Sequence, residues 1–298
     1  GITMTAAVSR NLMGTQDLYI STPGQIGFSS YVGNFPATIR NQGLELEISS
    51  TNIQKKNFSW ITSFNFTLAK TVLTSFDNID DQSFYSNSYQ LGQPVPFNRQ
   101  YVVAGINSEN GVVIYQTGNA SGLPTYAVDQ VPNNIGNPYF GGINNSFTFH
   151  QLDFGFFFQF RHQYGYTNSL TGSLGSMNNQ NTTVLDRWRQ PGDEALFPGA
   201  SATAGKPIYN SYSFYYNSSS ALYGNASWLK LRNVSLGYTF TERVLTKLKL
   251  SKLRIYAQAQ NLFTVSNYEN VFDPETSVQG GPTLPPLRTV VFGLNASF

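Results

Sequence analysis

Apolar and polar side chains alternate with a period of two along much of this chain. The alternation is most regular between Gln151 and Arg161. A period of two is the pattern of a β-strand whose two faces meet different surroundings. A row of large apolar groups would promote aggregation of a soluble sheet, but it is expected where that face contacts lipid. One face of the segment carries Leu152, Phe154, Phe156, Phe158 and Phe160, and the other carries Gln151, Asp153, Gly155, Phe157, Gln159 and Arg161.

Seven further segments show the same alternation with varying strength. In the last of them, one face carries apolar residues that include Val290, Phe292 and Leu294 and ends at Phe298. The sequence therefore predicts about eight strands, each close to the roughly 9–11 residues that a tilted strand needs to cross a bilayer. The seven segments are Ile2–Arg10, Gln42–Ser49, Ser59–Leu68, Tyr139–Phe149, Asn233–Phe240, Leu253–Phe263 and Thr289–Phe298.

The connections between these segments are alternately short and long. Alternation of this kind is typical of outer-membrane β-barrels, which have tight periplasmic turns and long outer loops. It predicts a periplasmic rim of aromatic side chains formed by Phe58, Trp60, Tyr238, Phe240 and Phe298, because such rings favour the membrane interface. The short connections are Thr51–Asn57, His150 and Thr241–Ser251, and the long ones are Asn11–Ala37, Thr71–Pro138, Gln163–Asn225 and Thr264–Leu287.

Composition supports a membrane barrel over other classes. The chain of 298 residues has 11% charged and 15% aromatic residues, whereas soluble domains carry about 25% charged residues. No run approaches the roughly 18 apolar residues of a transmembrane helix. The absence of cysteine excludes disulfides and thiolate metal sites, and a net charge of +2 without a basic stripe does not favour nucleic acid. The chain does not begin with a signal peptide, so we expect an exported protein to begin upstream of it.

The inward-facing residues predict a sector of a wide barrel rather than a complete small one. A closed eight-stranded barrel fills its interior with side chains, but here Ser, Thr, Asn and Gly dominate that face. We therefore expect residues 1–298 to form part of one all-β, antiparallel transmembrane barrel domain, the last eight or so strands of a plugged barrel of about 22 strands. A soluble β-sandwich is the alternative, but it would need both faces to be apolar.

Several motifs, taken in order, resemble those of SusC-like (SusC/RagA) TonB-dependent outer-membrane transporters. Singly some are weak, but the ordered set is specific and extends from about residue 38 to the end of the chain. The matching segments are Asn41–Glu47, Phe58–Trp60 with Asn65, Gly136–Gly142, Phe147–Phe158, Trp228–Tyr238, Asn261–Thr264, Tyr268, Asp273–Glu275 and Arg288–Phe298.

The resemblance implies import of a nutrient, an oligosaccharide or a peptide, across the bacterial outer membrane. It implies a SusD-like surface lipoprotein as partner, and energy from the TonB–ExbB–ExbD complex through an N-terminal plug. Neither the plug nor a TonB-contacting segment is recognisable here, so we expect both in preceding sequence. The alternatives are a passive outer-membrane channel and a surface-binding or adhesive barrel.

Two sets of residues are candidates for contact with substrate or partner. Aromatic rings in the outer loops can stack on sugars or hold peptide side chains, or they can pack the loops against one another. On the luminal phase, Glu45 and Glu47 can steer a cationic substrate or pair with arginines of a plug. The loop candidates are Tyr85, Tyr89, Tyr101, Tyr126, Trp188, Tyr215, Tyr216 and Tyr223, and the luminal candidates are Glu45, Glu47, Asn65, Asp153 and Gln159.

The sequence does not indicate an enzyme or a bound cofactor. His150 and His162 are the only histidines, and they are predicted at opposite ends of one strand, too far apart to share a metal or a catalytic proton. No Gly-x-Ser-x-Gly motif occurs. Asp77, Asp80 and Asp81 could hold a calcium ion in an outer loop, although such a cluster is more often a solvated turn.

The end of the chain is a candidate signal for barrel assembly. Phe292 and Phe298 are predicted on the lipid-facing side of the last strand, and Phe298 at its periplasmic end. Because the aromatic terminus is exposed to lipid there, we expect the assembly machinery to engage it.

Overall fold

The structure of the chain is a computed structural model. It describes residues 1–14, 17–22, 25, 27–34, 36–77, 79, 89–95, 98–125, 128–133, 136–166, 174, 175, 177, 179, 180, 182–212, 216, 219–266, 273–275 and 284–298.

Eight long strands form one antiparallel sheet, in which each strand pairs with its neighbours along the sequence. The short strand β12 (Tyr223–Asn225) adds to the outer end of the fifth of them. The eight predicted strands are confirmed, and most are longer than predicted. In sheet order they are β1 (Ile2–Gly14), β4 (Ala37–Lys55), β5 (Phe58–Phe76), β10 (Gly136–Phe149), β11 (Leu152–Tyr166), β13 (Trp228–Thr239), β14 (Lys252–Ser266) and β15 (Thr289–Ser297).

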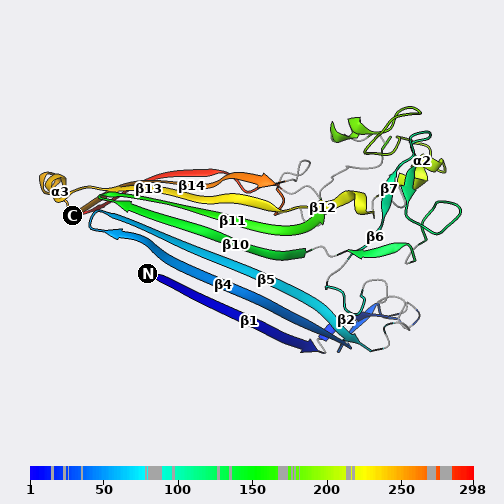
Figure 1. Cartoon of the computed structure of the whole chain (residues 1–298), viewed down its shortest axis with the longest axis horizontal. Coiled ribbons are helices and arrows are strands. Elements are labelled where there is room, and N and C mark those ends of the chain that lie inside the picture. Colours follow the sequence, from blue (N-terminus) through cyan, green and yellow to red (C-terminus); the bar gives the residue numbers. More distant parts are fainter. Residues whose placement is uncertain are drawn as a thin grey trace.

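The short connections all lie at the end of the sheet where the chain terminates, and the long connections lie at the other end (Figure 1). β4 and β5 are joined through Lys56 and Asn57 alone, and β10 and β11 through His150 and Gln151. The backbone N–H of His150 donates to the carbonyl of Asn57 at 3.0 Å, which ties these two turns together. The alternation predicted from the sequence is therefore confirmed.

The third short connection differs from the simple turn expected. It holds a helix, α3 (Glu242–Leu248), which ends at Lys249 in the left-handed conformation (φ 56°). No helix among the described residues is both long and apolar enough to cross a membrane. The first short connection is also shorter than predicted, because residues 51–55 belong to strand β4.

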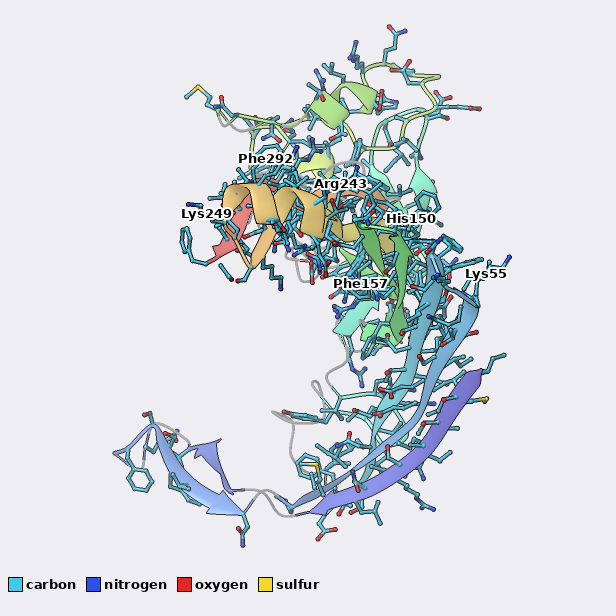
Figure 2. The ribbon with its side chains drawn as sticks, turned by 90° about the vertical axis from the view of Figure 1, so that its left-hand side faces the viewer. Lys55, His150, Phe157, Arg243, Lys249 and Phe292 are labelled. Atoms are coloured by element: carbon cyan, nitrogen blue, oxygen red, sulfur yellow. The ribbon has the colours of Figure 1, made fainter. Side chains whose placement is uncertain are left out.

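The sheet curves into an open arc with one polar and one apolar face. Figure 2 shows Phe157 directed into the arc and Phe292 away from it. Cross-strand partners point to the same side of a sheet, so the register assigns whole rows to the convex face. One such row reads Trp60, Phe147, Phe154, Leu236, Ala257 and Phe292.

The convex face is apolar and uncovered by other parts of the described chain. Phe292 is 80% exposed, and Phe154 and Leu236 are also exposed. Rings stack along the strands, with 5.6 Å between the centroids of Trp60 and Phe147 and 6.0 Å between those of Phe147 and Phe154. Exposure of so much apolar area to water is unfavourable by about 25 cal/mol per Å², so this face fits a lipid environment.

One polar cluster interrupts the convex face. Asn145 lies in a row with Thr62, and its Oδ1 accepts hydrogen bonds from Trp60 Nε1 at 2.9 Å and from Thr62 Oγ1 at 2.7 Å. Asn52, at a bulge of β4, donates to Thr62 Oγ1 at 2.7 Å. Polar atoms are costly in an apolar environment unless they are hydrogen-bonded, and these satisfy one another.

The structure groups the predicted rim of aromatic residues at one end of the sheet. Its members lie at the short-turn end, where the Phe58 and Phe149 ring centroids are 6.5 Å apart and those of Tyr238 and Phe240 are 5.0 Å apart. Phe240 follows the last residue of β13 rather than belonging to the strand.

The outer connections have secondary structure and a buried core of their own. This core is the larger of the two described hydrophobic clusters, and no second layer of described residues packs against the sheet. It consists of Tyr101, Val113, Tyr115, Leu174, Phe197, Tyr212, Tyr216 and Leu222. The elements are the pairs β2 (Asp17–Ser21) with β3 (Ser30–Asn34), β6 (Asn98–Tyr101) with β9 (Gln130–Asn133) and β7 (Val103–Ile106) with β8 (Val113–Tyr115), and the short helices η3 (Thr182–Asp186), α2 (Pro207–Asn210) and η6 (Ser220–Leu222).

Candidate functional site: the concave wall

The concave face carries the polar residues singled out in the sequence. Glu47, Asn65, Gly142, Gln159 and Lys230 are successive cross-strand partners from β4 to β13, so they form one row on that face. Glu45 and Asp153 have the same alternation phase on their strands and therefore share it. The five candidate residues thus lie on one surface, and three of them, Glu47, Asn65 and Gln159, share one row.

A buried ion-pair cluster lies toward the outer end of this wall. Lys230 Nζ is 2.6 Å from Asp273 Oδ1, 2.7 Å from Asp273 Oδ2 and 2.9 Å from Glu275 Oε2. Arg232 Nη2 lies 2.6 Å from both carboxylate oxygens of Glu275. Lys230 is 3% exposed and Asp273 is 5% exposed. Two cations and two carboxylates therefore attach the β14–β15 connection to strand β13.

A β-bulge brings the second cation into this cluster. Leu231 pairs with Phe158 and Asn233 with Phe157, which leaves Arg232 as the extra residue of β13. A bulge inserts one residue into the alternation of the strand. Because of this extra residue, both Arg232 and the adjacent Asn233 can lie on the concave face with Lys230. Arg232 Nε accordingly donates to Gln159 Oε1 at 2.6 Å on the concave face.

Trp228 packs among the cations of this cluster. Its ring is buried, and its centroid lies 4.9 Å from Lys230 Nζ and 5.6 Å from the guanidinium carbons of both Arg161 and Arg232. Cations are attracted to the face of an indole ring, and more strongly where water is excluded. The tryptophan thus offsets part of the cost of burying Lys230.

Glu275 is ionised in this arrangement. Burial raises the pKa of its carboxyl, but hydrogen bonds and charge from Lys230 and Arg232 lower it by more, so the pKa lies below its usual value. The cluster is therefore neutral overall. It contains no group placed as a nucleophile or a general base, and its geometry supports a positioning role.

A second ion pair crosses the concave face nearer the short turns. Arg254 Nη2 on β14 is 2.6 Å from Asp153 Oδ2 on β11, and it spans the intervening strand β13. Gly237 is the β13 residue opposite Asp153, whereas Arg254 is opposite Thr239, so the ion pair runs diagonally past Gly237. A Cβ at this position would lie within 3 Å of the charged ends of both side chains, so the glycine leaves room for the pair in the geometry observed.

The five described loop candidates all contact other parts of the chain. Tyr101 and Tyr216, the latter 1% exposed, lie in the loop core, and Tyr223 packs against that core. Trp188 Nε1 donates to the carbonyl of Ser108 at 2.7 Å, and Tyr89 packs edge-on against Phe76. These contacts favour packing of the loops over direct substrate contact. Tyr85, Tyr126 and Tyr215 lie outside the described residues.

The histidines occupy separate sites. His162 stacks on Tyr139 with 4.8 Å between centroids, and its Nδ1 lies 2.8 Å from Ser227 Oγ, while His150 lies in the β10–β11 turn. Within the described part of the chain, no three His, Asp or Glu side chains are grouped as a metal site. Asp77 is exposed, and the other two residues of the calcium hypothesis, Asp80 and Asp81, fall outside the described residues.

Sequence reasoning missed the ion-pair cluster although its residues belong to recognised motifs. The available signal was the pairing of two cations in alternate positions, Lys230 and Arg232, with two carboxylates close together, Asp273 and Glu275. They are 43 residues or more apart in the sequence, and periodicity alone does not connect them.

Known proteins with similar sequences are TonB-dependent receptors. No family model matches the chain. TonB-dependent receptor P39 of Formosa agariphila is 24% identical over 366 aligned positions, which cover 99% of this chain and 34% of the relative. TonB-dependent receptor SusC of Bacteroides thetaiotaomicron is 25% identical over 319 positions, covering 99% and 30%. The chain spans about a third of the length of the curated relatives it matches.

Solved structures show the same fold. The RagAB peptide importer in the open-open state superimposes with a TM-score of 0.75 at 21% identity, covering 99% of this chain and 33% of the matched chain. The RagAB peptide transporter gives 0.75 at 22% identity. The resemblance to SusC-like TonB-dependent receptors is confirmed, the fold fits a sector of their barrel, and none of these relatives is named as an enzyme.

Substitution of Lys230 tests the ion-pair cluster. Lys230→Met leaves the buried Asp273 without its counter-charge, while Glu275 keeps Arg232, so we expect the full-length protein to lose about 3–5 kcal/mol of unfolding free energy. Denaturant unfolding in detergent measures the loss. Asp273→Asn in the same background should recover part of it, because one unpaired charge is removed.

Lys70→Met is the matched control, because Lys70 is an exposed cation on β5 and its loss should change stability by less than about 0.5 kcal/mol. Equal stability of the Lys230→Met and Lys70→Met variants would show that the cluster does not attach the connection to the wall.

Proposed function

We propose that this chain forms part of the wall of a TonB-dependent outer-membrane importer of nutrients, either oligosaccharides or peptides. The observation that carries the proposal is the curved sheet with an uncovered apolar convex face and a polar, ion-paired concave face (Figure 2). The fold it shares with the RagAB importer supports the same conclusion. The bacterial outer membrane is the location that fits this pair of faces.

The wall belongs to one barrel domain that includes residues 1–298 and is wider than these strands. Within the described chain, β1 and β15 are the two edges of the sheet. An arc open at both edges needs further strands to pair its backbone groups within lipid. A wide barrel of this kind leaves a lumen that a plug occupies.

Transport proceeds in this proposal by capture followed by energised entry. A SusD-like lipoprotein and the outer loops hold the substrate. The TonB–ExbB–ExbD complex displaces the plug and acts through sequence outside this chain. The concave face then offers side chains such as Glu47, Asn65 and Gln159 as hydrogen-bonding contacts. The ion-pair cluster keeps the segment around Asp273 and Glu275 against the wall and out of the path.

Uptake by the full-length protein tests this function. A strain that lacks the gene is complemented, with its lipoprotein partner, and supplied with a peptide panel and an oligosaccharide panel. We expect accumulation of members of one panel, and its loss when TonB is removed. Uptake that persists without TonB would instead identify a passive channel, and surface binding of either panel without uptake would identify an adhesive barrel.

We further propose that Phe292 and Phe298 form the assembly signal. Phe298 is 97% exposed at the end of the last strand, at the rim where the short turns lie. Deletion of Phe298 should strongly reduce the protein recovered from outer-membrane fractions, and Phe298→Trp should retain normal recovery because it keeps an aromatic terminus. Normal insertion of the deletion variant would exclude the role.

A further inference from the structure

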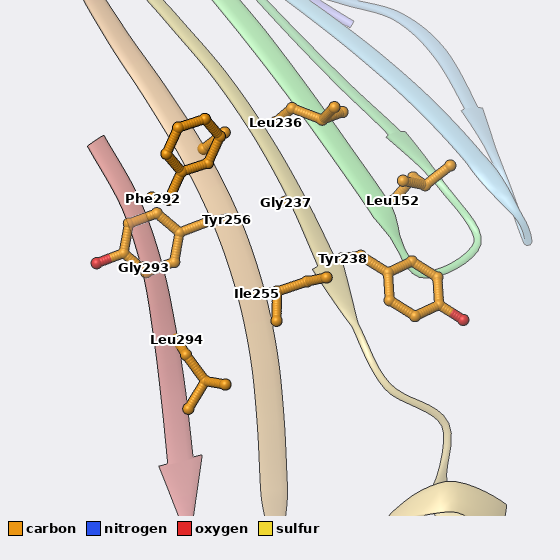
Figure 3. Close-up of a pocket in the computed structure, with 10 residues that line it drawn as sticks. Leu152, Leu236, Gly237, Tyr238, Ile255, Tyr256, Phe292, Gly293 and Leu294 are labelled. Atoms are coloured by element: carbon orange, nitrogen blue, oxygen red, sulfur yellow. The ribbon is translucent and has the colours of Figure 1, made fainter. Parts of the chain in front are cut away.

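An apolar groove of about 510 Å³ lies on the convex face at the short-turn end. Figure 3 shows Leu236 and Phe292 at one end and Tyr238 and Leu294 toward the turn. Leu236 and Phe292 belong to one cross-strand row, and the residue between them in that row is Ala257. Because a methyl group is much smaller than its neighbours, the surface is recessed there.

A basic connection adjoins this groove. The chain runs from β13, beside Tyr238, directly into α3 (Figure 3). Four exposed cations follow in ten residues, Arg243, Lys247, Lys249 and Lys252, against the single carboxylate of Glu242. The short helix that bears the first two also has apolar residues such as Leu248, which is 53% exposed.

We propose that this region binds one anionic glycerophospholipid of the periplasmic leaflet. An acyl chain occupies the groove, and the phosphate contacts the cations of the α3 connection. The inference rests on the proposed function, because it requires the convex face to be in lipid and the short turns to be periplasmic.

The chemistry of the groove fits a hydrocarbon chain rather than a protein. Among the lining residues on the convex phase, only Tyr238 has a polar side-chain atom, because Tyr256 belongs to the concave row of Asp153 and Gly237, whereas protein interfaces have a polar rim and many hydrogen bonds. The adjoining cations set the preference for an anionic headgroup, since each basic residue near a membrane surface strengthens binding of anionic lipid. Groove and charge together match an amphiphile with an apolar tail and a negative head.

The β4–β5 turn, at the same end of the sheet, supplies a matched comparison. Lys55, the last residue of β4, and Lys56, in the β4–β5 connection, are exposed cations at the same end of the sheet, and neither lines the groove. A general attraction of the basic rim for anionic lipid would depend equally on both turns. A specific site depends on α3 alone.

Native mass spectrometry of the delipidated full-length protein measures the site. Phosphatidylglycerol and phosphatidylethanolamine with the same acyl chains are added in equal amounts at low salt. We expect preferential retention of one phosphatidylglycerol. Arg243→Gln with Lys247→Gln should lower its affinity by about fivefold for each cation removed, and Lys55→Gln with Lys56→Gln should leave it unchanged.

Ala257→Phe tests the groove separately, because the added ring fills the recess on the outer surface. It should reduce retention of both lipids, with folding checked by the heat-dependent shift of the barrel on electrophoresis. Equal retention of the two lipids, equal effects of the two turns, or unchanged retention in a folded Ala257→Phe variant would each overturn the site.

The outcome is separable from that of the uptake experiment. TonB-dependent uptake without lipid selectivity would overturn this inference alone. Selective retention of phosphatidylglycerol without uptake of either panel would overturn only the proposed transport.

Discussion

Backbone N–H and C=O groups inside a bilayer have no water to pair with, so each strand must receive its hydrogen bonds from a neighbouring strand. This constraint explains why every long strand here pairs antiparallel with the next long strand in the sequence, and it fits a sheet that no other described part of the chain covers. It also places lipid on one face of the sheet and water on the other. The rows of aromatic and aliphatic residues then face outward, and the polar residues face the arc's interior.

Charge on the concave face is handled by local neutralisation. Lys230 and Arg232 are balanced by Asp273 and Glu275, and Arg254 is balanced by Asp153. A buried charge without a partner costs several kcal/mol, whereas a well-paired cluster recovers much of that cost and specifies one geometry. The ion pairs connect elements that are not adjacent in the sequence. They therefore fix the relative positions of these elements, which strand pairing between sequence neighbours alone does not do. As a result, ion pairs hold the β14–β15 connection against the wall, and the concave surface stays polar.

Much of the fold could be predicted because the alternation of apolar and polar residues follows directly from having lipid on one face of the sheet and water on the other. It underestimated β4, predicted as Gln42–Ser49 and observed as Ala37–Lys55, because pairing continues beyond the lipid, where alternation is no longer required. The helix α3 was missed because that connection was judged by length alone. The buried positions of Tyr101 and Tyr216 were not predictable, since aromatic residues serve equally to bind ligands and to pack loops, and only tertiary contacts distinguish the two.

The central claim is that the convex face contacts lipid and the concave face contacts water. This chain has no cysteine; in a full-length protein from which cysteines elsewhere are removed, single cysteines introduced along β11 can each carry one spin label in bilayers. The account predicts that labels at Phe154, Phe156 and Phe158 are accessible to dissolved oxygen, and that labels at Gly155 and Phe157 are accessible only to a water-soluble nickel complex or are buried against a plug. Accessibility without a period of two, or with the opposite phase, would contradict it.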